Sequence, residues 1–364
     1  MYIGGFKFIY MRKSILSIVI LLSMCFCMRA QDDKLQMIVV RDTASAFRDA
    51  QISYNSGITN FQGKKLKEAL TDFNKAIELI PNFDKAYYNR GVVKFETKDY
   101  NGAIADYDKV IALVPTADNA YFSRGEAYIA LKKKSEALKD FTMAIELDPK
   151  QAHYFYNRGI LKFENNNPKE AIDDFTSAIK LKSDYAYAYN DRGSAKRHLE
   201  DYNGAIADYT EAIRLNPSMA FAYNNLGSVK KKKGDFEGAI NEYNQAIRLK
   251  SDYYIALNNR GSAKFEMGDY EGAIKDFSEA IKINSQYAFA YNNRASAKFK
   301  LMDYTGSVAD CNEAIKLDSE YGFAYLNRGI AKEMLRDQEG ACKDWKKAGT
   351  LGITNGTNYS KECK

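Results

Sequence analysis

The sequence predicts an all-α solenoid of nine helix-turn-helix units, because three features recur every 34 residues along the 364-residue chain. The first is a small residue that we call the marker position, occupied by Gly57, Gly91, Gly125, Gly159, Gly193, Gly227, Gly261, Ala295 and Gly329. A second small residue follows 12 positions later and an aromatic ring 16 positions later, as Ala205 and Tyr209 follow Gly193. Small residues let two helices approach closely, and the ring fills the space between them.

The nine units follow one another without insertion or deletion. They span 50–83, 84–117, 118–151, 152–185, 186–219, 220–253, 254–287, 288–321 and 322–355. In each unit, helix A is expected over about the first fourteen positions, and helix B after a turn such as Gly234-Asp235-Phe236.

The first unit is the least typical, with Ser53 and Ser56 where most later units have an aromatic residue and an arginine. The eighth has Ser307 and Cys311 at the small and aromatic positions. The ninth unit ends in Gly349, Gly352 and a polar tail, and atypical end units are expected because one face of each has no neighbour.

This spacing of small and aromatic positions resembles the tetratricopeptide repeat, and the resemblance covers about residues 50–355. Prolines near the ends of four units fit the family pattern, and serines replace them in four others. The resemblance implies a right-handed superhelix of paired antiparallel helices. It also implies a concave groove, lined by helices A, in which ligands bind.

Residues 1–30 are interpreted as a signal peptide, with Met11 as the expected true start. Arg12 and Lys13 precede an apolar run, and Ala30 offers a small residue for cleavage. A lipid anchor on Cys25 is the less favoured alternative, because the preceding methionine is bulky for that signal. Residues 31–49 form a leader. The protein is therefore expected to be exported, either periplasmic or secreted.

Composition and motifs argue against several classes of function. The formal net charge is +6, and removal of residues 1–30 leaves about +2, which does not favour nucleic-acid binding. The two histidines lie at different repeat positions, and neither has a second ligand at metal-binding spacing. No phosphate-binding loop or nucleophile elbow occurs in the sequence. We expect no enzyme activity, cofactor, metal or small-molecule substrate.

An arginine precedes the marker in seven units, and an acid follows it by 15 positions in all nine. Because the guanidinium matches a carboxylate, these columns predict a ladder of partly buried ion pairs that includes Arg90, Arg260, Asp106 and Asp276. The same pattern leaves open whether each arginine meets the acid of its own unit or of a neighbour. An anion-binding site is the alternative interpretation. The unit with Leu226 in place of arginine is also the one with Glu242 in place of aspartate.

Asparagine recurs two residues before the marker, where its low helix propensity calls for another explanation. The predicted groove residues in this column are Asn89, Asn157, Asn225, Asn259, Asn293 and Asn327, and Ser123 and Asp191 interrupt it. One helical turn earlier, the same stripe carries Tyr187, Phe221, Phe289 and Phe323. The column is similar to the asparagine ladder of O-linked N-acetylglucosamine transferase, which implies that it holds an extended peptide by its backbone. Alternatively, these asparagines form hydrogen bonds within the solenoid.

Residues 356–364 are expected to be a C-terminal tail or cap, in which Cys363 could pair with Cys342 or both could remain free thiols. The function predicted from the sequence is an exported, non-catalytic scaffold that binds a peptide or protein partner in its groove, with possible envelope association. Two alternatives remain open. One is a glycan- or cell-wall-binding module, and the other is an architectural spacer in an envelope complex.

Overall fold

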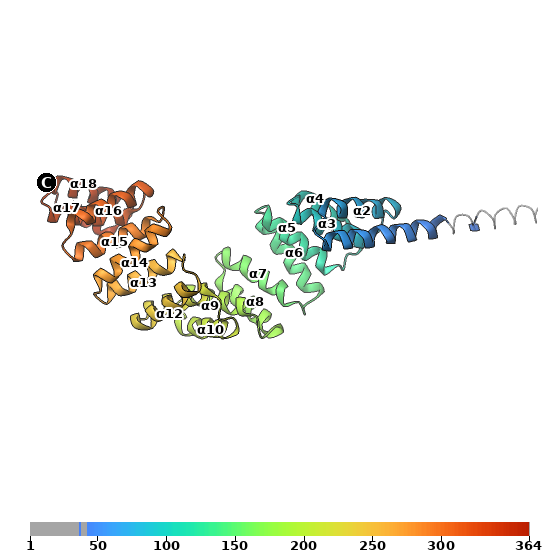
Figure 1. Ribbon diagram of the computed structural model, residues 1–364, viewed down its shortest axis with the longest axis horizontal. Coiled ribbons are helices and arrows are strands. Elements are labelled where there is room, and N and C mark those ends of the chain that lie inside the picture. The colour runs from blue at the N-terminus through green and yellow to red at the C-terminus, as the bar shows by residue number, and fades with distance from the viewer. Residues whose placement is uncertain (1–35, 38–41, 364) are drawn as a thin grey trace, which may run out of the picture. The chain divides into compact units, whose positions relative to one another are not determined.

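The computed structural model describes residues 36–37 and 42–363, which form helices joined by short turns and contain no strand (Figure 1). The expected signal peptide, its start at Met11, Cys25 and most of the leader lie outside these residues. Residues 42–62 form one continuous helix, so the last part of the leader and helix A of the first unit are a single element. Within the described residues, no helix is long and apolar enough to cross a membrane.

The remaining helices alternate between helix A and helix B of each unit. In chain order they are α2 (Leu66–Leu79), α3 (Asp84–Glu96), α4 (Tyr100–Leu113), α5 (Asp118–Ala130), α6 (Lys134–Leu147), α7 (Ala152–Glu164), α8 (Pro168–Leu181), α9 (Ala186–His198), α10 (Tyr202–Leu215), α11 (Ala220–Lys232), α12 (Phe236–Leu249), α13 (Tyr254–Glu266), α14 (Tyr270–Ile283), α15 (Ala288–Lys300), α16 (Tyr304–Leu317), α17 (Gly322–Met334), α18 (Gln338–Thr350) and α19 (Thr354–Ser360). The chain divides after Pro149 into two compact parts, which are described separately below.

In the second part, the helices A form one continuous layer. Each helix A packs against its own helix B, and successive helices A, from α9 to α11, α13, α15 and α17, also contact one another. Successive helices B have at most marginal contact with each other. Successive helices A are therefore closer together than successive helices B, which places the helices A on the concave side of this part. We call the exposed face of the helices A the groove.

The marker glycine lets the aromatic ring of helix B reach helix A. At Gly193, an added Cβ would lie only 3.0 Å from Cε1 of Tyr209, whose ring is fully buried. Ala205, the small residue of the same unit, is fully buried in the same cluster. In the eighth unit, the marker position is Ala295, whose methyl group is larger than the hydrogen of glycine, and the smaller Cys311 replaces the aromatic ring.

The turn between the two helices follows the sequence prediction in the sixth unit. Gly234 has a φ of 84°, the left-handed region in which glycine is favoured, and it ends α11. Asp235 then caps α12 by accepting a hydrogen bond from the backbone N–H of Gly238 at 2.9 Å. Helix B therefore begins at Phe236, directly after the predicted turn.

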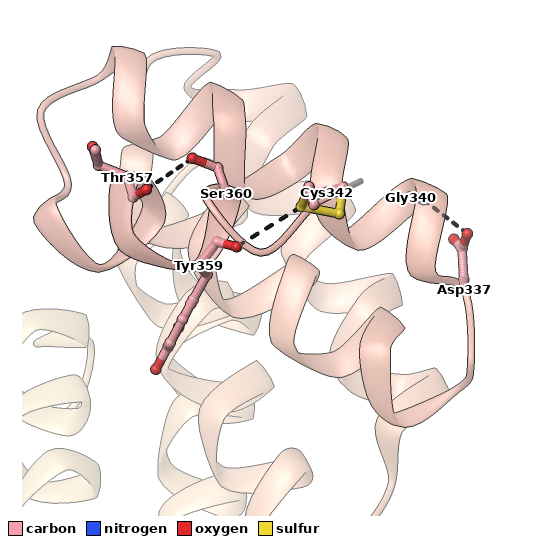
Figure 2. The surroundings of a disulfide bond; sticks show 7 residues. Asp337, Gly340, Cys342, Thr357, Tyr359 and Ser360 are labelled. Carbon is pink, nitrogen blue, oxygen red and sulfur yellow. Dashed lines mark hydrogen bonds between the residues drawn. A yellow bond between two sulfur atoms is a disulfide. The ribbon is translucent and has the colours of Figure 1, made fainter.

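The C-terminal tail is an ordered cap. The additional helix α19 packs on α18, and Figure 2 shows the disulfide bond that joins Cys342 of α18 to Cys363, with a Cα–Cα distance of 5.7 Å. Gly356 allows the close crossing, because an added Cβ would lie 2.7 Å from Cβ of Ala348. Of the two states left open by the sequence, the structure contains the paired cysteines.

Candidate functional site

Four of the predicted groove asparagines form one row in the second part, on α11, α13, α15 and α17. All four are half-buried, and each donates a hydrogen bond from Nδ2 to the side-chain oxygen of a buried asparagine one unit earlier. The pairs are Asn225 to Asn190 (3.2 Å), Asn259 to Asn224 (2.9 Å), Asn293 to Asn258 (3.0 Å) and Asn327 to Asn292 (2.9 Å). Hydrogen bonding within the solenoid, the alternative interpretation, therefore accounts for the amide nitrogens of this row.

Asp191 sets the orientation of the first pair of the row, Asn190 and Asn225. Asn190 donates from Nδ2 to Oδ1 of Asp191 at 2.9 Å, and an ionised carboxylate can only accept. Asn190 must then present its oxygen to Asn225, so Asn225 bonds through Nδ2 and its oxygen stays available as an acceptor. Among the described residues, no donor reaches the side-chain oxygens of Asn225, Asn259, Asn293 and Asn327. The row therefore offers the groove a series of hydrogen-bond acceptors.

The other two predicted asparagines are bonded differently. In the first part of the chain, Asn89 donates to the hydroxyl of Tyr54 at 3.0 Å and to the carbonyl of Lys85 at 2.9 Å. In the second part, Asn157 donates to the carbonyl of His153 in its own helix at 2.8 Å. Neither joins the row of four, so the continuous acceptor row begins only at Asn225.

An aromatic stripe lies one helical turn from the asparagine row. Tyr187, Phe289 and Phe323 are each about half exposed, at 50, 53 and 53%. The ring of Phe221 lies 6.1 Å from that of Tyr187, and Phe289 packs 5.0 Å from Tyr321. Large apolar rings that remain this exposed are available to contact a ligand. The groove thus combines oriented acceptors with an apolar surface.

Each arginine of the ladder pairs with the aspartate of its own unit. Arg260 donates from Nε and Nη2 to the two carboxylate oxygens of Asp276, at 2.9 and 2.6 Å, and Nη1 donates to Asn244 of the preceding unit at 2.7 Å. Lys264 adds a second cation 2.8 Å from Asp276. In the first part, Arg90 joins Asp106 in the same bidentate way, at 2.9 and 2.6 Å. The guanidinium groups are thus engaged within the solenoid.

The sixth unit shows how the ladder tolerates the loss of its arginine. Leu226 occupies the arginine position, and Glu242 instead accepts from Lys230 at 2.6 Å. Lys230 and Lys264 belong to a column of lysines three residues after the marker. This column recurs with the repeat, so the sequence contained the signal for the second cation, although the prediction did not include it.

Asp191 is expected to destabilise the fold at neutral pH. Burial raises the pKa of its carboxyl above the ordinary value, and the hydrogen bonds from Tyr156 and Asn190 only partly lower it. Since the folded state binds the proton more tightly than the unfolded state, stability increases as the pH falls from the raised pKa toward the ordinary one. Above the raised pKa, the cost of the ionised form is present in full.

Asp191→Asn should therefore raise the melting temperature at pH 7, and its advantage over the wild type should shrink as the pH falls through the raised pKa. The new amide can donate to Tyr156, as Asn89 does to Tyr54 at 3.0 Å. Thermal melts of both proteins over a pH series measure this effect. The exposed Asp184→Asn is the control and should change little at any pH. An advantage independent of pH would contradict the role given to the buried carboxylate.

Comparison with protein families assigns the repeat. Models described as "TPR repeat" match residues 57–98, 93–132, 193–234, 227–268 and 261–301, and models described as "Tetratricopeptide repeat" match 119–151 and 152–185. The chain belongs to the tetratricopeptide repeat family. No sequence among the curated proteins matches it. The resemblance predicted from the 34-residue spacing is confirmed, and so is the all-α solenoid.

Solved structures with TM-scores above 0.5 share the fold. A protein from Parabacteroides merdae ATCC 43184 is 18% identical with a TM-score of 0.56, and the match covers 67% of this chain and 97% of that one. The Cut9-Hcn1 hetero-tetramer of the APC/C gives 18% identity and a TM-score of 0.55, over 76% and 54% of the two chains. YrrB, titled a TPR protein with an unusual peptide-binding site, is 25% identical with a TM-score of 0.46, over 51% and 95%.

Proposed function

We propose that this tetratricopeptide repeat protein is an exported, non-catalytic scaffold that binds an extended peptide or protein segment along the groove of its second part. The observation that carries the proposal is the row of outward-facing acceptors at Asn225, Asn259, Asn293 and Asn327, beside the aromatic stripe. An extended chain presents backbone N–H donors that such acceptors can bind. Alternate side chains of the segment would pack on the half-exposed rings.

The spacing of the row favours a segment in an extended, polyproline II-like conformation. Helices that pack against each other lie about 8–10 Å apart, so successive asparagines on contacting helices A are separated by a similar distance. A polyproline II chain has three residues per turn and repeats about every 9.3 Å. Successive asparagines of the row would then each accept from one backbone N–H, at intervals of three residues along the segment.

Export is supported by two independent features. The charged and apolar pattern within residues 1–30 is typical of a secretory signal peptide. Cys342 and Cys363 form a disulfide bond, and disulfides persist mainly in oxidising compartments such as the bacterial periplasm or the cell exterior. We propose on this basis that the mature chain works in the periplasm or outside the cell, in association with the envelope.

A glycan-binding role is the second candidate, because exposed aromatic rings such as Tyr187 and Phe289 also suit sugar faces. Panning a peptide-display library against residues 31–364, in parallel with binding measurements on soluble cell-wall glycans, separates the two candidates. Enrichment of peptides whose binding the glycans do not displace supports the scaffold. Glycan binding without peptide enrichment would replace it with the second candidate.

Replacing Asn225, Asn259, Asn293 and Asn327 together by alanine is expected to abolish binding of the selected peptides, because the acceptor row is removed. The variant should also melt somewhat lower, since four buried asparagine oxygens lose their donors. Fluorescence anisotropy with a labelled peptide measures binding, and a thermal melt of the same sample measures folding.

A second variant separates binding from stability. Phe289→Ser with Phe323→Ser removes two half-exposed rings that take no part in the asparagine hydrogen bonds, so binding should fall while the melt changes little. The matched control is Met334→Ser with Leu335→Ser, which removes two apolar side chains of similar exposure at the C-terminal end of α17. Unchanged binding in both groove variants would place the binding surface elsewhere.

A further inference from the structure

A cavity lies beside the eighth unit, and Ser307, one of that unit's departures from the repeat pattern, is part of its lining. The cavity has a volume of about 210 Å³ and lies among α13, α15, α16 and α17. Phe265, Phe299 and Ile330 provide apolar walls. Ser296, Ser307 and Asn327 contribute polar groups to the lining.

In two other units, a tyrosine hydroxyl meets the serine that follows the marker position. In the fifth unit, the hydroxyl of Tyr209 lies 3.1 Å from Oγ of Ser194, and in the sixth unit the hydroxyl of Tyr243 lies 3.3 Å from Oγ of Ser228. Ser296 is the equivalent serine of the eighth unit, directly after the marker position. Cys311 replaces the ring there, so no tyrosine hydroxyl meets Ser296. Ser296 instead lines the cavity, and its Oγ accepts from Nδ2 of Asn327 at 3.2 Å.

Ser307 supplies an independent indication of a ligand. Its side chain is only 1% exposed, and Oγ has no hydrogen-bond partner within the described part of the chain. Alanine stands at this position in the other eight units, so the hydroxyl is peculiar to the unit that has the cavity. A buried hydroxyl without a partner destabilises a protein, and a bound polar group would remove that cost.

We infer that the cavity binds a phenol ring, namely a tyrosine side chain of the segment held in the groove. The inference rests on the proposed function, because Asn327 belongs both to the acceptor row and to the cavity lining. An apolar cavity of about 150 Å³ is enough to bind benzene, so 210 Å³ admits a phenol ring. Its hydroxyl would meet Ser296 and Ser307, in the way that Tyr209 meets Ser194.

The first test uses p-cresol, the side-chain analogue of tyrosine, and toluene, which has the same ring and methyl group without the hydroxyl. Saturation-transfer NMR titrations on residues 31–364 should show binding of p-cresol, and weaker binding of toluene. Ser307→Ala introduces the residue found in the other units. It should lower the affinity for p-cresol about 3- to 10-fold without lowering the affinity for toluene. An equal effect on both ligands would remove Ser307 from the site.

The second test fills the cavity from within. The triple variant Ala295→Gly, Ser307→Ala and Cys311→Tyr restores the combination of Gly193, Ala205 and Tyr209 found in the fifth unit. It should melt no lower than the wild type and lose p-cresol binding. Absence of p-cresol binding in the wild type, or equal binding by the triple variant, overturns the inference. Neither result bears on the groove itself, which the asparagine variant tests separately.

Discussion

Asp276→Ala is expected to lower the free energy of unfolding by about 3 kcal/mol, toward the lower end of the range for breaking a buried ion pair. Asp276 is only 3% exposed and accepts from both Arg260 and Lys264. Its removal leaves two cations close together without their common anion. The loss stays near the lower end because both cations keep about a fifth of their side-chain surface in water. Urea unfolding followed by circular dichroism measures it.

The sixth unit provides a matched control for this prediction. Glu242 occupies the same repeat position but meets one cation, Lys230, and their side chains are 18 and 25% exposed. Glu242→Ala should therefore cost clearly less than Asp276→Ala. The double variant Arg260→Ala with Asp276→Ala should cost less than the sum of its single variants, because the pair acts as a unit. Equal losses at Glu242 and Asp276, with strict additivity, would contradict the ladder.

The sequence predicted the helix pairs because the same spacing of a small residue and an aromatic ring recurs in eight of the nine units. The contact of Gly193 with Tyr209 follows directly from a small residue and a ring at fixed spacing on two helices. The partner of Arg260 did not follow in the same way. A strict period places an acid of the same unit and one of the preceding unit, Asp276 and Glu242, at equally regular positions. Only the geometry of the helix pair selects the first.

The chemistry of the groove was still less accessible from the sequence. The column of Asn225 and its counterparts was visible, but a carboxamide can present either a donor or an acceptor to a ligand. Which of the two stays available depends on contacts between units, and the bond from Asn190 to Asp191 decides it for Asn225. The exceptions Ser307 and Cys311 could likewise be read in the sequence, whereas the cavity beside Ser307 depends on how the neighbouring helices pack.

Loss of the disulfide bond between Cys342 and Cys363 is expected to destabilise the ninth unit by about 3 kcal/mol, the value for closing a loop of this size. The two cysteines are 21 residues apart, and the loop they close contains α19. An end unit has no neighbour to cover its outer face. Here α19 supplies that cover, since Tyr359 packs 5.3 Å from Trp345 and Ile353 joins the same apolar cluster.

Hydrogen exchange measured by mass spectrometry, with and without a reducing agent, locates this effect. Reduction should speed exchange in α18 and α19 and leave α9 and α10 unchanged, because each unit of a solenoid is stabilised mainly by its immediate neighbours. The variant Cys342→Ala with Cys363→Ala should behave like the reduced protein. The thiol of Cys311 should not respond to the reducing agent, because it forms no disulfide and burial raises its pKa to about 12. Faster exchange spread evenly over α9 to α19 would mean that the bond stabilises the whole part, and unchanged exchange in α19 would mean that packing alone holds the cap.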